Sequence, residues 1–490
     1  MNSHKIYLFV YFFFVASLVS GVAPDFDIGP VGTGDLSLEG NKRLRSIGPV
    51  FECQATGDGT TFKAIRPFFS TVEDPGKNRR LDEYLWPIGM CKQLRKETYW
   101  RFLNAFGHDF DNTDGKSRFR FVIFPLVFGG RDKNLEEYFA LFPVGGRIHE
   151  FLSRDKITFF LFPLYASSVT GDLKTLDILW PFISRAKGTR VSRFRVFPFY
   201  GRSKREGEYD KMFAMWPVWT SATFKNPSHK GHSFILFPLF GHARVNHQMK
   251  GLPTRKSETW WVLPPFFKWA GDGTHVEWNC PYPFLQYSSG KIDKLYIWPL
   301  WGTRTYKNNS SQFFLWPVFR WYKTKRPNEI LKRFYMVPLV QYESRVRETV
   351  GEAKQKHELP YVTARYFKLW PLLSYRREYN EAYFRMLDLW PTKHLDSVER
   401  NLAPFWTLYS HERLGSEKED ELLWGLYRHR RGPKSGRKVS IFPLFLWRTN
   451  KINNLKEWRF LMGLAGYKRE NRRKTFRLLY LLKWSSGGVE

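Results

Sequence analysis

One short phrase recurs along almost the whole chain: an aromatic residue, then proline, then an aliphatic or aromatic residue. The proline returns about every 16 to 21 residues. A fixed period near 20 residues is typical of repeat architectures, in which one small unit is used many times. We therefore expect one continuous repeat rather than several unrelated domains. The repeat prolines of the clearest copies are Pro125, Pro143, Pro163, Pro181, Pro198, Pro217, Pro238, Pro299, Pro317, Pro371 and Pro443.

The segments between turn-forming stretches indicate β-strands. They are about ten to thirteen residues long and rich in Phe, Trp, Tyr, Val and Ile, which favour strands. A helix is excluded, because a proline in the middle of every unit would break it. The turns are short enough for antiparallel hairpins. The predicted fold is all-β, a repetitive antiparallel up-and-down meander of about 22–24 strands with the repeat proline in mid-strand.

Counting positions from the repeat proline separates the two faces of such a strand. One face holds the proline with positions −4, −2 and +2, which are almost always apolar, as at Phe159, Leu161 and Tyr165. The other face becomes small or polar away from the proline, as at Arg193 and Gly201. Because side chains alternate with a period of two, a slip of one residue would exchange the faces.

Two architectures fit this pattern. The first is a closed outer-membrane-type β-barrel, whose strands are apolar outside and polar inside. The consistently apolar stretch rises only about 15 Å, less than the usual band of about 25 Å. Proline cannot donate to a ladder, so this interpretation also requires a bulge or bend at each proline. The alternative is a soluble β-solenoid or a large folded β-sheet array with the apolar face buried.

The N-terminal segment indicates export. Residues 6–19 are apolar, too few to span a bilayer as a helix, and small residues follow them, as in a secretory signal peptide. The expected organisation is a signal peptide at 1–21, an irregular segment at 22–44, a continuous β-repeat domain at 45–484 and a tail at 485–490. We therefore expect a bacterial cell-envelope protein, located in the outer membrane, with the periplasm or cell surface as alternatives.

The charge balance indicates anionic partners. The chain carries 78 Lys and Arg against 46 Asp and Glu, a net charge of +32, which attracts anionic surfaces. Expected partners are membrane lipid or lipopolysaccharide, or anionic small molecules or polymers. Nucleic acid is not expected, because the charges are spread through the turns. The candidate lumen or anion-contacting residues of the barrel are Arg120, Arg193, Arg195, Lys294, Arg304, Arg320, Arg333 and Lys368.

Residue patterns for catalysis or metal binding are weak. His229, His232, His242 and His247 have no cysteine or carboxylate cluster beside them, so we interpret them as solvated turn histidines. The acidic run 417–421 is interpreted as a solvated hairpin turn. We expect no enzyme activity, metal or cofactor. The expected function is a porin-like pore or structural barrel with a basic interior, because rings of Lys and Arg line anion pores. The alternative is a surface or periplasmic scaffold that binds anionic envelope polymers.

The repeat and the final hairpin, which begins with Gly463 and ends with Trp484, resemble exported bacterial proteins built from FPLYW/WPL-type β-strand repeats. The resemblance covers most of the chain after residue 21. It implies export and a β-repeat fold. No activity is attached to the repeat, so the resemblance implies no catalytic residue.

Overall fold

The computed structural model describes residues 26–248, 254–347, 361–452, 454–479 and 482–486. The expected signal peptide at 1–21 therefore lies outside the described residues. Strands make up 63% of the structure and helices 5%, so the protein is all-β as predicted. The strands form one antiparallel meander.

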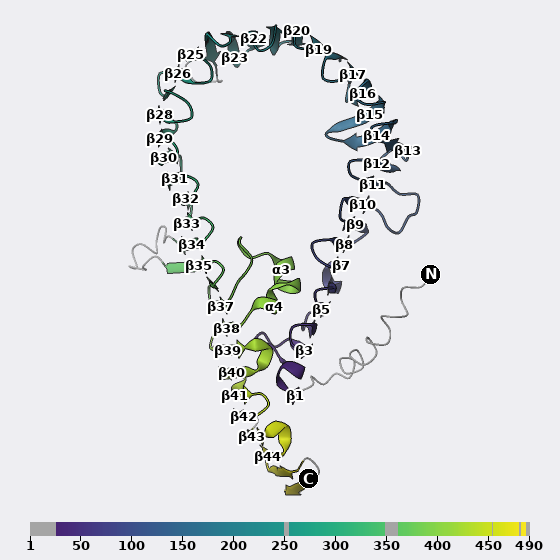
Figure 1. The fold of residues 1–490 in the computed structure, drawn as a ribbon, viewed down its shortest axis with the longest axis vertical. Helices are drawn as coiled ribbons and strands as arrows, with labels where there is room; N and C mark the ends of the chain where they lie inside the picture. The colour runs from purple at the N-terminus through teal and green to yellow at the C-terminus, as the bar shows by residue number, and fades with distance from the viewer. Residues whose placement is uncertain (1–25, 249–253, 348–360, 453, 480–481, 487–490) are drawn as a thin grey trace. The chain divides into compact units, whose positions relative to one another are not determined.

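The chain divides into two compact units, which are described separately. Unit 1 comprises the residues up to 95 and from 338 onward, and unit 2 comprises 96–337. In unit 2 the strands follow one another in sequence order (Figure 1). The strands of unit 2 are β9 (Glu97–Phe102), β10 (Ala105–Asp109), β11 (Phe119–Ile123), β12 (Val127–Arg131), β13 (Glu137–Leu141), β14 (Gly145–Phe151), β15 (Arg154–Phe160), β16 (Tyr165–Thr170), β17 (Leu173–Ile178), β18 (Ile183–Lys187), β19 (Val191–Val196), β20 (Tyr200–Arg205), β21 (Tyr209–Ala214), β22 (Trp219–Asn226), β23 (His229–Leu236), β24 (Phe240–His247), β25 (Arg255–Val262), β26 (Phe267–Gly271), β27 (Val276–Asn279), β28 (Leu285–Ser289), β29 (Asp293–Ile297), β30 (Trp301–Tyr306), β31 (Asn309–Phe314), β32 (Phe319–Arg326) and β33 (Glu329–Met336).

In its described residues, unit 1 combines strands from the N-terminal and C-terminal parts of the chain with two short α-helices and four 3-10 helices. Its strands are β1 (Phe26–Asp27), β2 (Gly32–Leu36), β3 (Lys42–Ser46), β4 (Phe51–Ala55), β5 (Thr61–Ile65), β6 (Phe69–Asp74), β7 (Arg79–Tyr84), β8 (Gly89–Leu94), β34 (Val340–Arg347), β35 (Tyr361–Leu369), β36 (Leu373–Glu378), β37 (Glu381–Met386), β38 (Tyr409–Leu414), β39 (Glu417–Leu422), β40 (Tyr427–Gly432), β41 (Gly436–Ile441), β42 (Phe445–Asn450), β43 (Leu455–Phe460), β44 (Ala465–Glu470), β45 (Arg473–Leu478) and β46 (Leu482–Ser486). Its helices are α3 (Asp396–Asn401), α4 (Ala403–Trp406), η1 (Gly29–Val31), η2 (Pro75–Lys77), η3 (Leu423–Gly425) and η4 (Leu461–Gly463).

The described residues form 46 strands, about twice the predicted number, because the repeat proline lies in a turn and not in mid-strand. Strands β11 and β12 pair from Ile123 with Val127 outward, and Phe124, Pro125 and Leu126 form the loop between them. The amide of Leu126 donates to the Ile123 carbonyl at 2.7 Å. The Phe–Pro bond is cis, as in a type VI turn. The expected bulge in each strand was therefore wrong: each predicted strand is a hairpin of two short strands.

The proline turns have two lengths, and the length decides the faces. In three-residue loops, positions −2 and +2 pair, so they share a face as predicted. In four-residue loops, position −2 becomes a loop residue with a positive φ, as at Leu161, and positions −3 and +2 pair instead. Phe160 then shares a face with Tyr165, while Phe159 lies on the opposite face with Ala166. The predicted faces are therefore wrong for these hairpins, because one extra loop residue shifts the register by one.

Three other expectations concern the segment 22–44, the continuity of the repeat and the closure of the sheet. The segment 22–44, expected to be irregular, contains β1, β2 and the start of β3. The helices α3 and α4 interrupt the expected continuous repeat between β37 and β38. Within the described residues, β1 pairs only with β2 and β46 only with β45, so backbone hydrogen bonds do not close the sheet. An open sheet also fits the alternative of a large folded array.

The apolar core of unit 2 lies on one face of strands β11 to β15. It consists of six buried side chains: Val122, Phe128, Tyr138, Ala140, Ile148 and Phe159. Gly146, with a φ of +134°, allows β14 to approach β13 closely, because a Cβ there would lie 2.4 Å from the Ala140 Cα. Burial of these aromatic and aliphatic side chains stabilises this part of the meander.

Candidate functional site

The turns at one end of the strands in unit 2 are apolar. Because the strands form a meander, all repeat-proline turns of unit 2 lie at this end of the strands, which we call the Pro edge. The residue that follows each proline is exposed there. These residues are Leu126, Val144, Leu164, Phe182, Phe199, Val218, Leu239, Phe266, Phe284, Leu300 and Val318. The turns at the other edge, which we call the polar edge, carry mostly Gly, Asp, Asn, Lys and Glu, for example at 171–172, 206–208 and 307–308. Leu135 and Leu152 are exposed there as well.

An apolar row continues from the Pro edge onto one face of unit 2, which we call the apolar face. Its members are direct cross-strand neighbours next to the turns, and most of them are exposed. Across β15 to β20 the row reads Phe160, Tyr165, Ile178, Ile183, Val196 and Tyr200. Across β28 to β32 it reads Leu285, Ile297, Trp301, Phe314 and Phe319. Such an extent of exposed apolar surface marks a protein or membrane interaction site.

The opposite face of unit 2, which we call the basic face, carries seven of the eight basic residues predicted to contact anions. Cross-strand pairing places Arg195 beside Gly201 and Ser184, for example. The seven residues are Arg120, Arg193, Arg195, Lys294, Arg304, Arg320 and Arg333. The eighth, Lys368, belongs to unit 1 and is 1% exposed. It lies 3.0 Å from Asp388 and also donates to the Thr392 carbonyl, so it forms a buried ion pair away from solvent.

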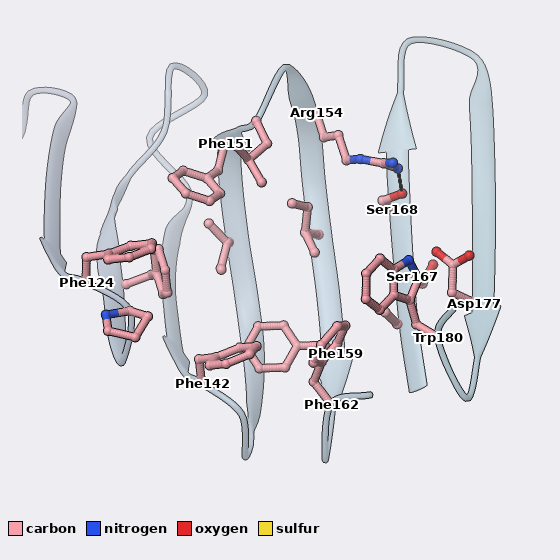
Figure 2. Close-up of a pocket in the computed structure, with 16 residues that line it drawn as sticks. Phe124, Phe142, Phe151, Arg154, Phe159, Phe162, Ser167, Ser168, Asp177 and Trp180 are labelled. Atoms are coloured by element: carbon pink, nitrogen blue, oxygen red, sulfur yellow. Dashed lines mark hydrogen bonds between the residues drawn. The ribbon is translucent and has the colours of Figure 1, made fainter. Parts of the chain in front are cut away.

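An apolar pocket of about 390 Å³ opens on the basic face near β11 to β18 (Figure 2). Its floor is formed by the buried Phe128, Ile148 and Phe159. Aromatic residues of the proline turns form a wall: Phe142 lies 5.3 Å from Phe162, ring centre to ring centre. Phe162 in turn lies 5.7 Å from Trp180. Position −1 of the repeat therefore covers one end of the pocket.

Arg154 lies at the other end of this pocket, next to the turn of Leu152 and Ser153 between β14 and β15 (Figure 2). Its guanidinium donates a hydrogen bond to the Ser168 hydroxyl. No carboxylate lies within ion-pair distance of Arg154 among the described residues. Asp177 lines the pocket nearer Trp180, away from Arg154 in this view.

A polar cluster lies beside the pocket, where β13 and β14 separate after two residue pairs. His149 Nδ1 lies 2.7 Å from an Asp132 carboxylate oxygen, and the His149 ring stacks on Tyr138 at 5.1 Å. Asp132 also accepts the amides of Asn134 and Glu136. Asp132, Glu136 and His149 bring possible ligand atoms within 4.8 Å of one another. Because both Asp132 oxygens already accept hydrogen bonds, this cluster stabilises the turn.

A second pocket on the basic face, of about 400 Å³, is lined in part by Arg320. Tyr296, Tyr322 and Trp316 line it, together with Gln286. Burial raises the pKa of Tyr296, with Arg304 acting in the opposite direction. A guanidinium between aromatic rings is suited to bind planar anionic groups.

Unit 1 contains a buried charged junction between its N-terminal and C-terminal strands. Arg428 on β40 is 1% exposed and lies 2.9 Å from Asp35 on β2. The same guanidinium lies 3.5 Å from Glu419 and 3.6 Å from Glu421. Three more ion pairs join these segments: Arg43 with Glu419 at 3.1 Å, Arg45 with Glu421 at 2.9 Å and Lys438 with Asp27 at 2.7 Å.

The buried charges of this junction shift the pKa values of nearby carboxylates in unit 1. Burial by itself raises the pKa of Glu421, but Arg45, Arg428 and Arg43 outweigh it and lower the pKa to about 2. Burial raises the pKa of Glu412, and Arg43 only partly offsets it. The side chains of Arg43, Arg45, Glu412 and Glu421 line a cavity of about 430 Å³.

Helix α3 contributes further ion pairs and hydrogen bonds to the polar interior of unit 1. Arg400 lies 3.0 Å from Glu83 on β7, and the Asn401 side-chain amide donates to Glu83 at 2.8 Å. Arg66 donates to the Pro49 carbonyl and pairs with Glu52 at 2.6 Å. Burial by itself raises the pKa of Glu83, but the hydrogen bond from Arg400 and its neighbours lowers it overall. The cavity therefore lies inside a polar core that joins the chain's two ends.

Two groups of polar residues lie in strands and not in the turns predicted from the sequence. The acidic run 417–421 forms strand β39, and Glu419 is 4% exposed, so it is not a solvated turn. The four histidines lie on β23 and β24 rather than in turns. His229 and His247 face each other, with Nδ1 atoms 3.1 Å apart, and His242 pairs with Glu258. Burial and the neighbouring His229 lower the pKa of His247.

Arg154, Arg428 and the floor residues of the apolar pocket were not among the candidate site residues predicted from the sequence. For the acidic run, the alternation of Glu417, Glu419 and Glu421 at every second residue is a strand signal that could have shown a shared face. Arg154 follows no repeat position, so only the fold brings it to the pocket.

Among the described residues, no helix is long and apolar enough to cross a membrane. No protein-family model and no curated protein matches this sequence.

Proposed function

We propose that this chain is a non-enzymatic cell-envelope protein whose Pro edge inserts into a lipid bilayer. The observation that carries the proposal is the concentration of exposed Leu, Phe, Trp and Val at the Pro edge and on the apolar face of unit 2. Insertion removes this apolar surface from water, which contributes about 25 cal/mol per Å². Export and an outer-membrane location belong to the same proposal and rest on the apolar residues 6–19.

Strand length favours insertion into one leaflet. A six-residue strand such as β20 rises about 20 Å, less than the hydrocarbon core of about 30 Å. The charged turns of the polar edge would then stay at the head groups or in water. Interfacial amphipathic segments bury their apolar side about 5–10 Å into the boundary between head groups and acyl chains, so they also stay within one leaflet. The basic excess would add attraction to anionic lipid or lipopolysaccharide.

Flotation with vesicles tests this proposal. After detergent removal, wild-type protein is expected to float with neutral phosphatidylcholine vesicles in high salt, because the attraction is apolar. A variant with Leu126→Glu, Leu164→Glu, Leu239→Glu and Leu300→Glu is expected to remain unbound, since these exposed side chains would carry charge into lipid. The matched control places four glutamates on the polar edge: Asn134→Glu, Thr189→Glu, Asn308→Glu and Asn328→Glu. Monodisperse wild-type protein that ignores vesicles would instead favour the scaffold for anionic polymers.

A pore or structural barrel with a basic interior is the second candidate, favoured by the location of seven basic residues on the face opposite the apolar row. The direct cross-strand neighbours of Arg193 and Arg195 on β19 and of Arg320 on β32 are all uncharged. If the protein conducts in planar bilayers, Arg193→Gln, Arg195→Gln and Arg320→Gln together are expected to lower anion preference in reversal-potential measurements. Unchanged selectivity with intact conductance would contradict the basic interior.

A further inference from the structure

We infer that the apolar pocket of unit 2 binds one acyl chain of an anionic membrane lipid, with the head group at Arg154 and the chain directed toward the Pro edge. This inference rests on the proposed membrane insertion of that edge. It assigns the pocket a ligand class and a direction of binding.

The pocket wall matches an acyl chain in chemistry and size. The floor residues Phe128, Ile148 and Phe159 are almost fully buried, and the wall residues Phe142 and Phe162 are aromatic. The volume of about 390 Å³ lies at the low end of the range of about 300–1,000 Å³ for small-molecule sites, which suits one chain better than a two-chain lipid.

Arg154 supplies the charge that selects the head group. A guanidinium has five N–H donors, and the described contacts of Arg154 use one of them on Ser168. Carboxylate and phosphate oxygens accept two parallel hydrogen bonds from such a group. With no carboxylate in ion-pair distance among the described residues, Arg154 is available to bind an anion.

The direction of binding follows from where the two ends of the pocket lie. Arg154 and Phe151 flank the turn of Leu152 and Ser153, at the edge opposite the proline turns to which Phe142 and Phe162 belong (Figure 2). A lipid bound in this way has its head at the polar edge and its chain at the edge proposed to enter the membrane. The pocket wall is continuous with that edge through Phe142 and Phe162, so a chain entering from the bilayer meets mainly apolar side chains, with Ser167 and Asp177 among the few polar ones.

Photo-crosslinking with two diazirine-labelled palmitates tests the inference on the full chain. A diazirine at the end of the chain is expected to label the turn peptides around Phe142 and Phe162. A diazirine near the carboxylate is expected to label the peptide around Phe151. Unlabelled palmitate should compete, and its uncharged methyl ester should compete weakly. Labelling of both regions by both probes, without competition, would overturn the inference.

Two variants separate the head-group contact from general lipid affinity. Arg154→Gln is expected to reduce saturable pocket labelling about tenfold, because a charge-assisted pair is lost. Arg185→Gln is the control, since Arg185 lies on nearby β18 but on the opposite face, beside Leu176 and Phe194. Ala166→Leu, which narrows the pocket, should reduce labelling by palmitate and block any binding of the ester. Equal labelling of wild type and Arg154→Gln, with both proteins folded, would contradict the assignment.

The outcomes distinguish this inference from the proposed function. Protein that floats with vesicles but shows no saturable pocket labelling retains the membrane function and loses the lipid site. Protein that labels saturably at the pocket but does not float retains the site and loses the insertion of the Pro edge.

Discussion

Replacing Arg428 with methionine is expected to destabilise unit 1 by about 3–5 kcal/mol, the usual cost of removing one partner from a buried ion network. The guanidinium lies within 3.6 Å of Asp35, Glu419 and Glu421 and is 1% exposed. Methionine fills part of the volume but leaves these carboxylates buried with less compensation. Because a repeat sheet opens locally, hydrogen exchange in β2, β3, β39 and β40 is the measurement that reports the change.

Arg431→Met is the matched control for this change. Arg431 lies on the same strand but is exposed on the other face, opposite Lys418 and Arg437. Its replacement is expected to change stability by less than about 0.5 kcal/mol. Similar exchange rates in the two variants would show that the junction does not hold the N-terminal strands.

The effect of Arg428→Met is also expected to depend on pH. The pKa of Glu421 is lowered from 4.5 to about 2 in the folded protein, and that of Asp35 is also lowered. A depressed carboxyl pKa adds stability above the unfolded value, and this stability is lost as pH falls through the folded pKa. The difference between wild type and variant should therefore persist at pH 5 and shrink between pH 4.5 and about 2. A difference that grows on acidification would contradict this account.

Replacing Phe159 with alanine is expected to cost about 3–5 kcal/mol in unit 2, as for other buried aromatic residues. Phe159 is 5% exposed and packs against Phe142, with ring centres 5.8 Å apart. The loss should appear as faster hydrogen exchange in β14 to β16 and a lower urea midpoint for this part of the sheet.

Phe160→Ala is the control, one residue away on the opposite face. Phe160 is 62% exposed, so its loss should change stability in water little. Under the proposed function, it should instead weaken vesicle binding, while Phe159→Ala should leave the vesicle binding of folded protein unchanged. The reverse result for the two phenylalanines would mean that the faces of this hairpin are assigned wrongly.

Local sequence determined much of the fold. The recurring aromatic–proline phrase with strand-forming segments was enough to predict an all-β antiparallel meander, and the structure confirms it. The location of the prolines was predicted wrongly, because strand propensity reads Phe119 to Arg131 as one segment although Pro125 reverses it. A proline without an amide hydrogen fits a turn better than a ladder.

The repeat pattern predicted only part of the candidate sites. The basic residues from Arg120 to Arg333 could be assigned to one face, because alternation along a strand is a local property. The partner of Lys368 could not be assigned, since Asp388 is brought beside it by the return of the chain after β37.

The sequence by itself determined the all-β class, the antiparallel meander and the polar turns, because turn chemistry and strand propensity act over a few residues. The tertiary structure decided what lies together across hundreds of residues. The pairing of Arg428 with Asp35 joins positions 393 residues apart, and no local pattern encodes that contact. It also decided which face of each hairpin is buried, because a loop of three or four residues sets the register, and the register sets the direction of every side chain.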